Sequence, residues 1–317
     1  MSLNTIFRVI FSVAILVLLF AHMDLDVLQS TTIGFDPAFF AGALIFVLLQ
    51  ILFLAMRWHS ILNTGHVKTS FDISLFMNIA GYFANVLFIT SVGGILAKSA
   101  LALRHGFSVT QTIFATVIDR FMTFLALVAF SILGLPFLFD ILDTRLFLMT
   151  GLSLGVLVTM VLVAFVFLRS NSLGKVVFSN KKISSLALSL QKLKGERRLW
   201  GQVSLQSIAA QLCFIIAVYI LSLGIDGGHS KTIEFFALMP ILALISSLPI
   251  SIGGWGLREG AFVYGLGLIG FSIENAFLLS IQVGLVTLLA PFIVSLPYLF
   301  VSDYKNYMGG KTPDTSH

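Results

Sequence analysis

Long apolar stretches alternate with short polar ones along most of this chain. A helix needs about 20 apolar residues to cross the hydrocarbon layer of a bilayer. The uninterrupted stretches that reach roughly this length are 5–23, 37–56, 109–138, 146–168, 201–223 and 275–301. The pattern therefore predicts six full membrane-spanning helices.

Two further apolar stretches, 71–103 and 233–270, are interrupted near the middle. Each holds a glycine pair followed four residues later by a basic residue: Gly93-Gly94 with Lys98, and Gly253-Gly254 with Arg258. Glycine lets a chain turn sharply, and Pro249 breaks a helix that leads into the second turn. Each stretch is therefore predicted to form two helices joined by a turn at its glycine pair.

The basic residues predict which loops face the cytoplasm, because cytoplasmic loops carry an excess of Lys and Arg. Segment 169–200 contains eight basic residues and one acidic residue, and loop 57–70 contains Arg57 and Lys68 without an acid. Both are therefore expected inside. Loop 24–36 contains three aspartates without Lys or Arg, so it is expected outside.

The number of crossings then decides the architecture. Loop 57–70 and segment 169–200 share a side only if stretch 71–103 enters the membrane and returns to the same face. Stretch 233–270 is expected to do the same from the opposite face, which gives an inverted-topology repeat, as in many transporters. In the alternative, both stretches are kinked full spans whose glycines serve close packing, and segment 169–200 lies outside.

The predicted fold is an all-α polytopic membrane protein with two inverted repeats, six full spans and two re-entrant helical hairpins. Repeat one covers about 1–140 and repeat two about 146–302, and together they form one transmembrane domain, 1–302. Segment 169–200 is expected to lie on the inner leaflet, where anionic lipid binds it, and 303–317 is a polar tail. We expect the cytoplasmic membrane as the location, with both termini inside.

The composition excludes several classes of protein. Hydrophobic residues make up 58% of the 317 residues and charged residues 10%, whereas a soluble domain carries about 25% charged residues. A cytosolic enzyme, a nucleic-acid-binding module and a secreted disulfide scaffold are therefore excluded. The net charge of +5 then indicates membrane orientation and contact with anionic lipid, and we expect no nucleic-acid partner.

The candidate site combines the two hairpins with nearby charges. Hairpins that enter from opposite faces should meet near the midplane, where half-helix ends and cations can cradle a phosphate. The expected binding residues are the ionisable groups of these segments: Lys98, Arg104, Asp119, Arg120, Arg258 and Glu259. The expected backbone of the hairpins is small or helix-breaking: Gly93, Gly94, Pro249, Gly253, Gly254 and Gly256.

Structural roles remain open for some of these charges. Lys98 and Arg258 could extend to an interface, and Asp119 with Arg120 could tie helices together. Because neighbours on a helix do not face each other, Asp119 and Arg120 should each find a partner on another element. Glu259 is expected to be the counter-ion of Arg258. The histidines lack metal-ligand spacing, so we expect no metal and no cofactor.

The same residues resemble the lysylphosphatidylglycerol synthase transmembrane family, whose members are flippase-like integral membrane proteins. The resemblance covers most of the chain and is carried by Arg57-Trp58, Gly81-Tyr82-Phe83-Ala84-Asn85, Gly93-Gly94, Lys98, Arg104, Asp119-Arg120 and the block from Leu248-Pro249 to Arg258-Glu259. Ser91-Val92 stands where the family usually shows proline, Ile95 where an acidic residue is common, and Lys98 where arginine is more frequent. These departures concern the headgroup that the first hairpin would bind.

The resemblance implies a lipid translocase rather than an enzyme. Some members move aminoacylated phospholipid, and others are associated with lipid-linked sugars or surface polysaccharide. Because the chain stops soon after its last predicted span, we expect no soluble aminoacyl-transferase domain. The alternatives are a membrane glycosyltransferase that uses Asp24 and Asp26, or a non-catalytic partner of such enzymes.

Overall fold

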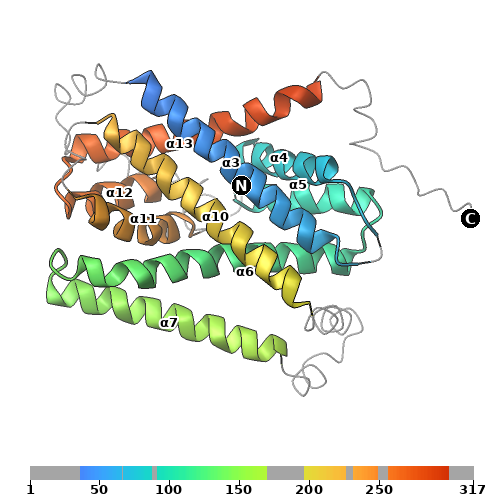
Figure 1. Ribbon diagram of the computed structural model, residues 1–317, viewed down its shortest axis with the longest axis horizontal. Helices are drawn as coiled ribbons and strands as arrows, with labels where there is room; N and C mark the ends of the chain where they lie inside the picture. The colour runs from blue at the N-terminus through green and yellow to red at the C-terminus, as the bar shows by residue number, and fades with distance from the viewer. Residues whose placement is uncertain are drawn as a thin grey trace, which may run out of the picture.

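The computed structural model describes residues 36–65, 67–87, 91–169, 196–225, 231–248 and 256–299 (Figure 1). These residues form nine α-helices and one short 3-10 helix, without a strand. The helices are α3 (Pro37–Leu62), α4 (Phe71–Leu87), α5 (Ser91–Arg104), α6 (Val109–Gly134), η1 (Leu135–Leu138), α7 (Thr144–Arg169), α10 (Arg197–Leu223), α11 (Thr232–Ser246), α12 (Leu257–Gly267) and α13 (Ile273–Leu299). The predicted span 5–23 and the tail 303–317 lie outside the described residues.

Four of these helices are long and apolar enough to cross a membrane: α3, α6 with η1, α10 and α13. Their bounds agree closely with the predicted spans, except that α3 continues six residues past residue 56. Helix α7 forms over the predicted span 146–168. The chain is therefore an integral membrane protein with several apolar helices.

Both interrupted stretches are indeed divided into two helices, α4 with α5 and α11 with α12. These helices have 17, 14, 15 and 11 residues. Each is shorter than the roughly 20 residues that a perpendicular crossing requires. In the second pair, Pro249, Gly253 and Gly254 lie outside the described residues.

The predicted position of the first turn was wrong. Helix α4 ends at Leu87 and α5 begins at Ser91, so Gly93-Gly94 lies in the first turn of α5. Gly94 serves close packing, because a Cβ at this position would overlap the Gly81 carbonyl oxygen and the Asn85 side chain. The Gly94 N–H also donates to Asn85 Oδ1 at 2.7 Å.

Several basic residues that we assigned to loops belong to helices. Arg57 is in α3 and is buried, so the loop after α3 retains only Lys68. Helix α7 ends at Arg169, and Arg197 and Arg198 form the first turn of α10. The basic segment is therefore shorter than 169–200, and residues 170–195 lie outside the described part of the chain.

Helices α3 and α10 lie side by side and run antiparallel, since Arg57 contacts Ser207 while Gly42 lies against Ile220, and they form the most extensive helix contact among the described residues (Figure 1). Helices α4 and α5 run antiparallel, since Asn78 contacts Lys98 while Asn85 contacts Gly94. Helix α11 packs on α6, and α12 packs on α13. Helix α7 lies at the edge of the bundle against α6.

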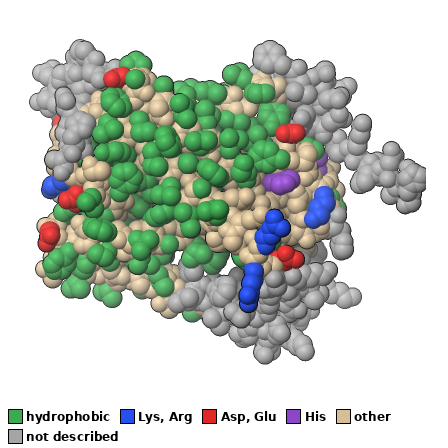
Figure 2. Space-filling model, in the orientation of Figure 1, with side chains coloured by type: hydrophobic (Ala, Val, Ile, Leu, Met, Phe, Trp, Pro, Cys, Tyr) green, Lys and Arg blue, Asp and Glu red, His purple; other side chains and the backbone are tan. Residues whose placement is uncertain are grey.

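The outer face of the bundle is apolar across its middle, and charged side chains gather towards its edges (Figure 2). Large hydrophobic side chains that remain exposed include Ile45 on α3, Leu133 on α6, Leu152 on α7 and Leu205 on α10. Such a wide apolar surface is unfavourable in water and matches the hydrocarbon region of a membrane.

Candidate functional site

A cavity of about 420 Å³ lies inside the bundle. Its walls come from α3, α4, α5, α6, α10, α11, α12 and α13, so both halves of the chain contribute. The charged side chains among its described lining residues are four cations and one carboxylate: Arg57, Lys98, Arg120, Arg258 and Asp119. The cavity therefore carries an excess of positive charge, and its volume suits a small polar ligand or a lipid headgroup.

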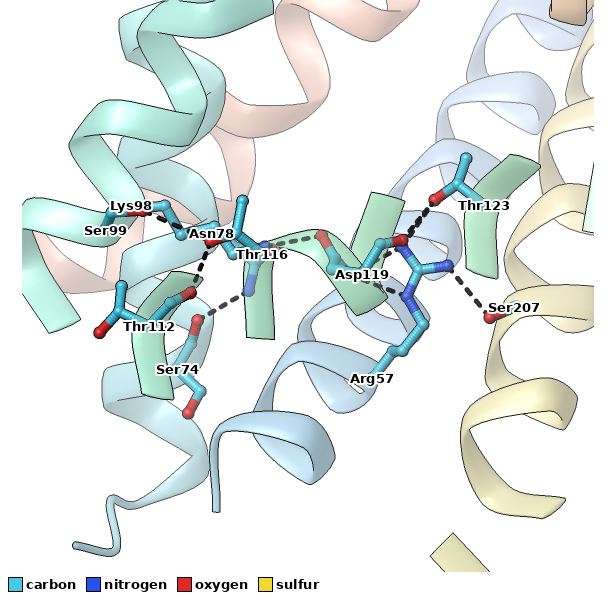
Figure 3. Close-up of polar contacts among 10 residues, drawn as sticks. All are labelled: Arg57, Ser74, Asn78, Lys98, Ser99, Thr112, Thr116, Asp119, Thr123 and Ser207. Carbon is cyan, nitrogen blue, oxygen red and sulfur yellow. Dashed lines mark hydrogen bonds and ion pairs between the residues drawn. The ribbon is translucent and has the colours of Figure 1, made fainter. Parts of the chain in front are cut away.

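Asp119 binds two of these cations at once (Figure 3). Its Oδ1 accepts hydrogen bonds from Arg57 Nε at 2.9 Å and forms an ion pair with Arg57 Nη2 at 2.8 Å. Its Oδ2 lies 3.2 Å from Lys98 Nζ. The expectation that Asp119 pairs with another element is thus confirmed, although both partners belong to the first half of the chain.

Arg57 is held by more than this carboxylate. Its Nη1 donates to Ser207 Oγ on α10 at 3.1 Å, and its Nη2 donates to Thr123 Oγ1 on α6 at 2.8 Å. The side chain is 1% exposed. A buried guanidinium needs such compensation, and these contacts join α3, α6 and α10 around it. The sequence prediction placed Arg57 in a loop and missed this role, because a hydropathy pattern ends an apolar span at its first charged residue.

Lys98 lies on the cavity wall, where α5 faces α4 and α6. Besides Asp119, its Nζ contacts Asn78 Oδ1 at 2.8 Å and lies 3.8 Å from the centre of a Trp58 ring. The ring face attracts the ammonium group by a cation–π interaction. Lys98 is therefore positioned by three neighbours and does not extend to an interface.

Arg258 reaches the same cavity from α12. Its Nη2 lies 2.6 Å from Glu259 Oε1, so the predicted ion pair is present. Glu259 is fully buried, and its Oε2 also accepts the Gly256 N–H at 2.5 Å. Gly256, at a φ of +84°, caps the start of α12 in a conformation that favours glycine. Glu259 thus positions Arg258 and does not itself line the cavity.

The remaining two predicted cations differ in position. Arg120 lines the cavity, is exposed, and makes no hydrogen bond or ion pair with any described residue. Arg104 is exposed in the last turn of α5 and is not among the described residues that line the cavity. The structure therefore brings Lys98, Asp119, Arg120 and Arg258 together and leaves Arg104 apart.

The neutral polar part of the lining was not foreseen from the sequence. It includes the amides Gln50 and Gln211, which come from the neighbouring helices α3 and α10. A single polar residue in an apolar run signals only that a partner is needed, and the sequence does not show whether protein or a ligand supplies that partner. Asp24 and Asp26, on which the glycosyltransferase alternative depends, lie outside the described residues.

Comparisons with known proteins identify the family of this chain. Neither a curated protein nor a solved structure matches the chain. The family described as the lysylphosphatidylglycerol synthase TM region matches residues 5–295. This range contains both helix pairs and every residue that lines the cavity. The chain therefore belongs to the lysylphosphatidylglycerol synthase transmembrane family.

Proposed function

We propose that this protein is a lipid translocase that moves a phosphate-bearing lipid across the cytoplasmic membrane without changing it chemically. The observation that carries the proposal is the cavity, in which four cations face one carboxylate inside an apolar bundle. Charged groups at membrane depth are costly and usually mark a transport path. An anionic headgroup supplies the missing negative charge.

The proposed architecture is the inverted repeat with two re-entrant hairpins, and the helix packing supports it. In this repeat, α3 corresponds to α10, α4 to α11, α5 to α12 and α6 to α13. The contact of α6 with α11 then becomes that of α13 with α4, and the contact of α5 with α6 becomes that of α12 with α13. The contacts of α3 with α4 and of α3 with α13 also have counterparts, in α10 with α11 and α10 with α6.

The lengths of the short helices support the two re-entrant hairpins. By rise per residue, α4 is about 26 Å long and α12 about 17 Å, both less than the roughly 30 Å hydrocarbon layer. Each pair would enter from one face, turn inside the protein and return to the same face. Irregular backbone at that depth is tolerated where protein or a polar cavity surrounds it.

Transport would follow from this arrangement. The headgroup binds between the halves while the acyl or isoprenyl chains stay in lipid, and the two repeats rock to open the cavity to each face in turn. Equal access to both faces equilibrates the lipid, and net transport requires a separate driving force. Membrane lipid is therefore the proposed partner. The basic residues of segment 169–200 would contact anionic lipid at the inner leaflet.

Reconstituted liposomes test the proposal directly. Labelled anionic phospholipids and polyprenyl-phosphate sugars are supplied in one leaflet, and their appearance in the other is measured with and without the protein. We expect faster exchange for at least one of them, and loss of this exchange in Arg258→Ala. Arg145→Ala is the matched control, since Arg145 is exposed at the start of α7, away from the cavity. An absence of stimulated exchange for every lipid would overturn the proposal.

A further inference from the structure

Two glutamine side chains in the cavity have no partner in the described protein. Gln50 on α3 and Gln211 on α10 both line the cavity, and neither makes a hydrogen bond to any described residue. Gln211 is only 4% exposed as a residue. Its amide atoms nevertheless keep some accessible surface in the lining of the cavity. A buried amide without a hydrogen bond costs free energy, so Gln211 is suited to a polar ligand. Gln50 is half-buried and offers a second unpaired amide in the same lining.

The two amides occupy related places in the fold. They come from α3 and α10, which lie side by side along their length, and these helices correspond to each other in the proposed repeat. An amide both donates and accepts hydrogen bonds, as a hydroxyl group does. The cavity therefore offers neutral, hydroxyl-matching groups from both halves, alongside the cations that suit a phosphate.

The described lining of the cavity offers no free carboxylate for an ammonium group. Asp119 is the only carboxylate among the described lining residues, and its two oxygens already bind Arg57 and Lys98. Glu259 is fully buried against Arg258 and the start of α12. An amine in the cavity would meet Lys98, Arg120 and Arg258 without a free counter-ion, and such like-charge contact is strongly unfavourable.

We infer that this cavity selects lipids in which the phosphate carries an uncharged, hydroxyl-bearing group, such as glycerol or a sugar, and that it rejects headgroups bearing an amine. The inference rests on the proposed lipid translocation and narrows its substrate class. Two sources share this chemistry, namely a glycerol-headed phospholipid and a sugar linked to polyprenyl phosphate.

The first experiment compares headgroups in reconstituted liposomes. Phosphatidylglycerol, its lysyl ester and phosphatidylethanolamine are supplied with identical acyl chains, and a polyprenyl-phosphate sugar forms a separate arm. We expect phosphatidylglycerol or the sugar lipid to exchange at least about tenfold faster than both amine-bearing lipids. The faster of these two arms identifies the source of the hydroxyl groups.

The outcomes separate the two proposals. If the lysyl ester exchanges as fast as phosphatidylglycerol, the headgroup inference is overturned while lipid translocation stands. If no lipid exchanges faster than in protein-free liposomes, lipid translocation itself fails.

The second experiment tests the glutamines through a ratio of rates. Phosphatidic acid has the phosphate but no hydroxyl-bearing group, so its exchange should not depend on the amides. In Gln211→Leu, the rate for phosphatidylglycerol relative to phosphatidic acid should fall about fivefold, as expected for one lost hydrogen bond. Gln50→Leu should act in the same direction. An unchanged ratio in both variants would contradict the inference.

The matched control is Gln202→Leu. Gln202 is exposed on the same helix, α10, and is not among the residues that line the cavity. Its replacement should leave the ratio as in the unmodified protein. A fall of the same size in Gln202→Leu would assign the effect to α10 as a whole and overturn the role of Gln211.

Discussion

Arg57 and Asp119, which are 62 positions apart, form a two-point ion pair inside the bundle. Both Nε and Nη2 of Arg57 reach the same carboxylate oxygen, Oδ1, and the remaining guanidinium contacts are hydroxyl groups on α6 and α10. The other carboxylate oxygen faces Lys98. Arg57 therefore balances Asp119 within the protein, and the less enclosed Lys98 is a cation that we propose for ligand binding.

The first prediction is that Asp119→Asn lowers stability. The substitution leaves Arg57 buried without its counter-ion, and breaking a buried pair in this way costs about 3–5 kcal/mol. Thermal unfolding of the purified protein in detergent should therefore occur at a clearly lower temperature.

A double-mutant cycle provides the control for this pair. Arg57→Met removes the buried cation, so Arg57→Met with Asp119→Asn should be less destabilised than the sum of the two single variants. Additive losses would show that Arg57 and Asp119 do not stabilise the fold through each other.

The helices could be predicted from the sequence because their signal is local. Apolar runs of about 20 residues fix α6, α10 and α13 to within a few positions, since hydrocarbon thickness sets the length. The division of 71–103 and 233–270 into helix pairs was also foreseen from glycine and proline. The turn between α4 and α5 was misplaced, because a glycine that permits a turn also permits close packing, and Gly94 is used for packing.

The site was less accessible to prediction, because its contacts are not local. Lys98, Asp119, Arg120 and Arg258 were identified as charges within apolar runs, and they do line one cavity. Arg57 was missed because it follows an apolar run directly and looks like the start of a loop. Its burial depends on Asp119, Thr123 and Ser207, which no sequence spacing connects to it.

The second prediction separates the two roles of Glu259. Glu259→Ala removes the acceptor of the Gly256 N–H, and an unsatisfied buried donor costs about 1–3 kcal/mol. Glu259→Gln keeps an acceptor oxygen but removes the charge that positions Arg258. We therefore expect Glu259→Ala to unfold at a lower temperature than Glu259→Gln. Equal unfolding temperatures would exclude capping of α12 by this side chain.

The third prediction concerns the packing of α4 against α5. In Gly94→Ala, the added methyl group meets the Gly81 carbonyl oxygen and the Asn85 side chain, which cannot both move without separating the helices. Overpacking of this kind costs about 1–3 kcal/mol, and the unfolding temperature should fall accordingly. Gly155→Ala on α7 is the matched control, because its Cβ meets nothing within 4 Å. The control should be neutral or slightly stabilising, since alanine favours helix.

The last prediction uses α13 to displace Arg258 without changing a charge. A Cβ on Gly284 would lie 2.6 Å from Arg258 Nη2 and 3.0 Å from Nη1, so Gly284→Ala must push the guanidinium aside. The stability should be retained, because Arg258 Nε also donates to Glu259 Oε1 at 3.1 Å and can keep the ion pair while the end of the guanidinium moves. Alanine also favours helix by about 1 kcal/mol over glycine. Lipid exchange should fall, because a cation in the cavity has moved relative to the phosphate. Gly267→Ala on α12, whose Cβ meets nothing within 4 Å, controls for the methyl group. If Gly284→Ala exchanges lipid at the unmodified rate, the position of the Arg258 guanidinium does not matter for transport.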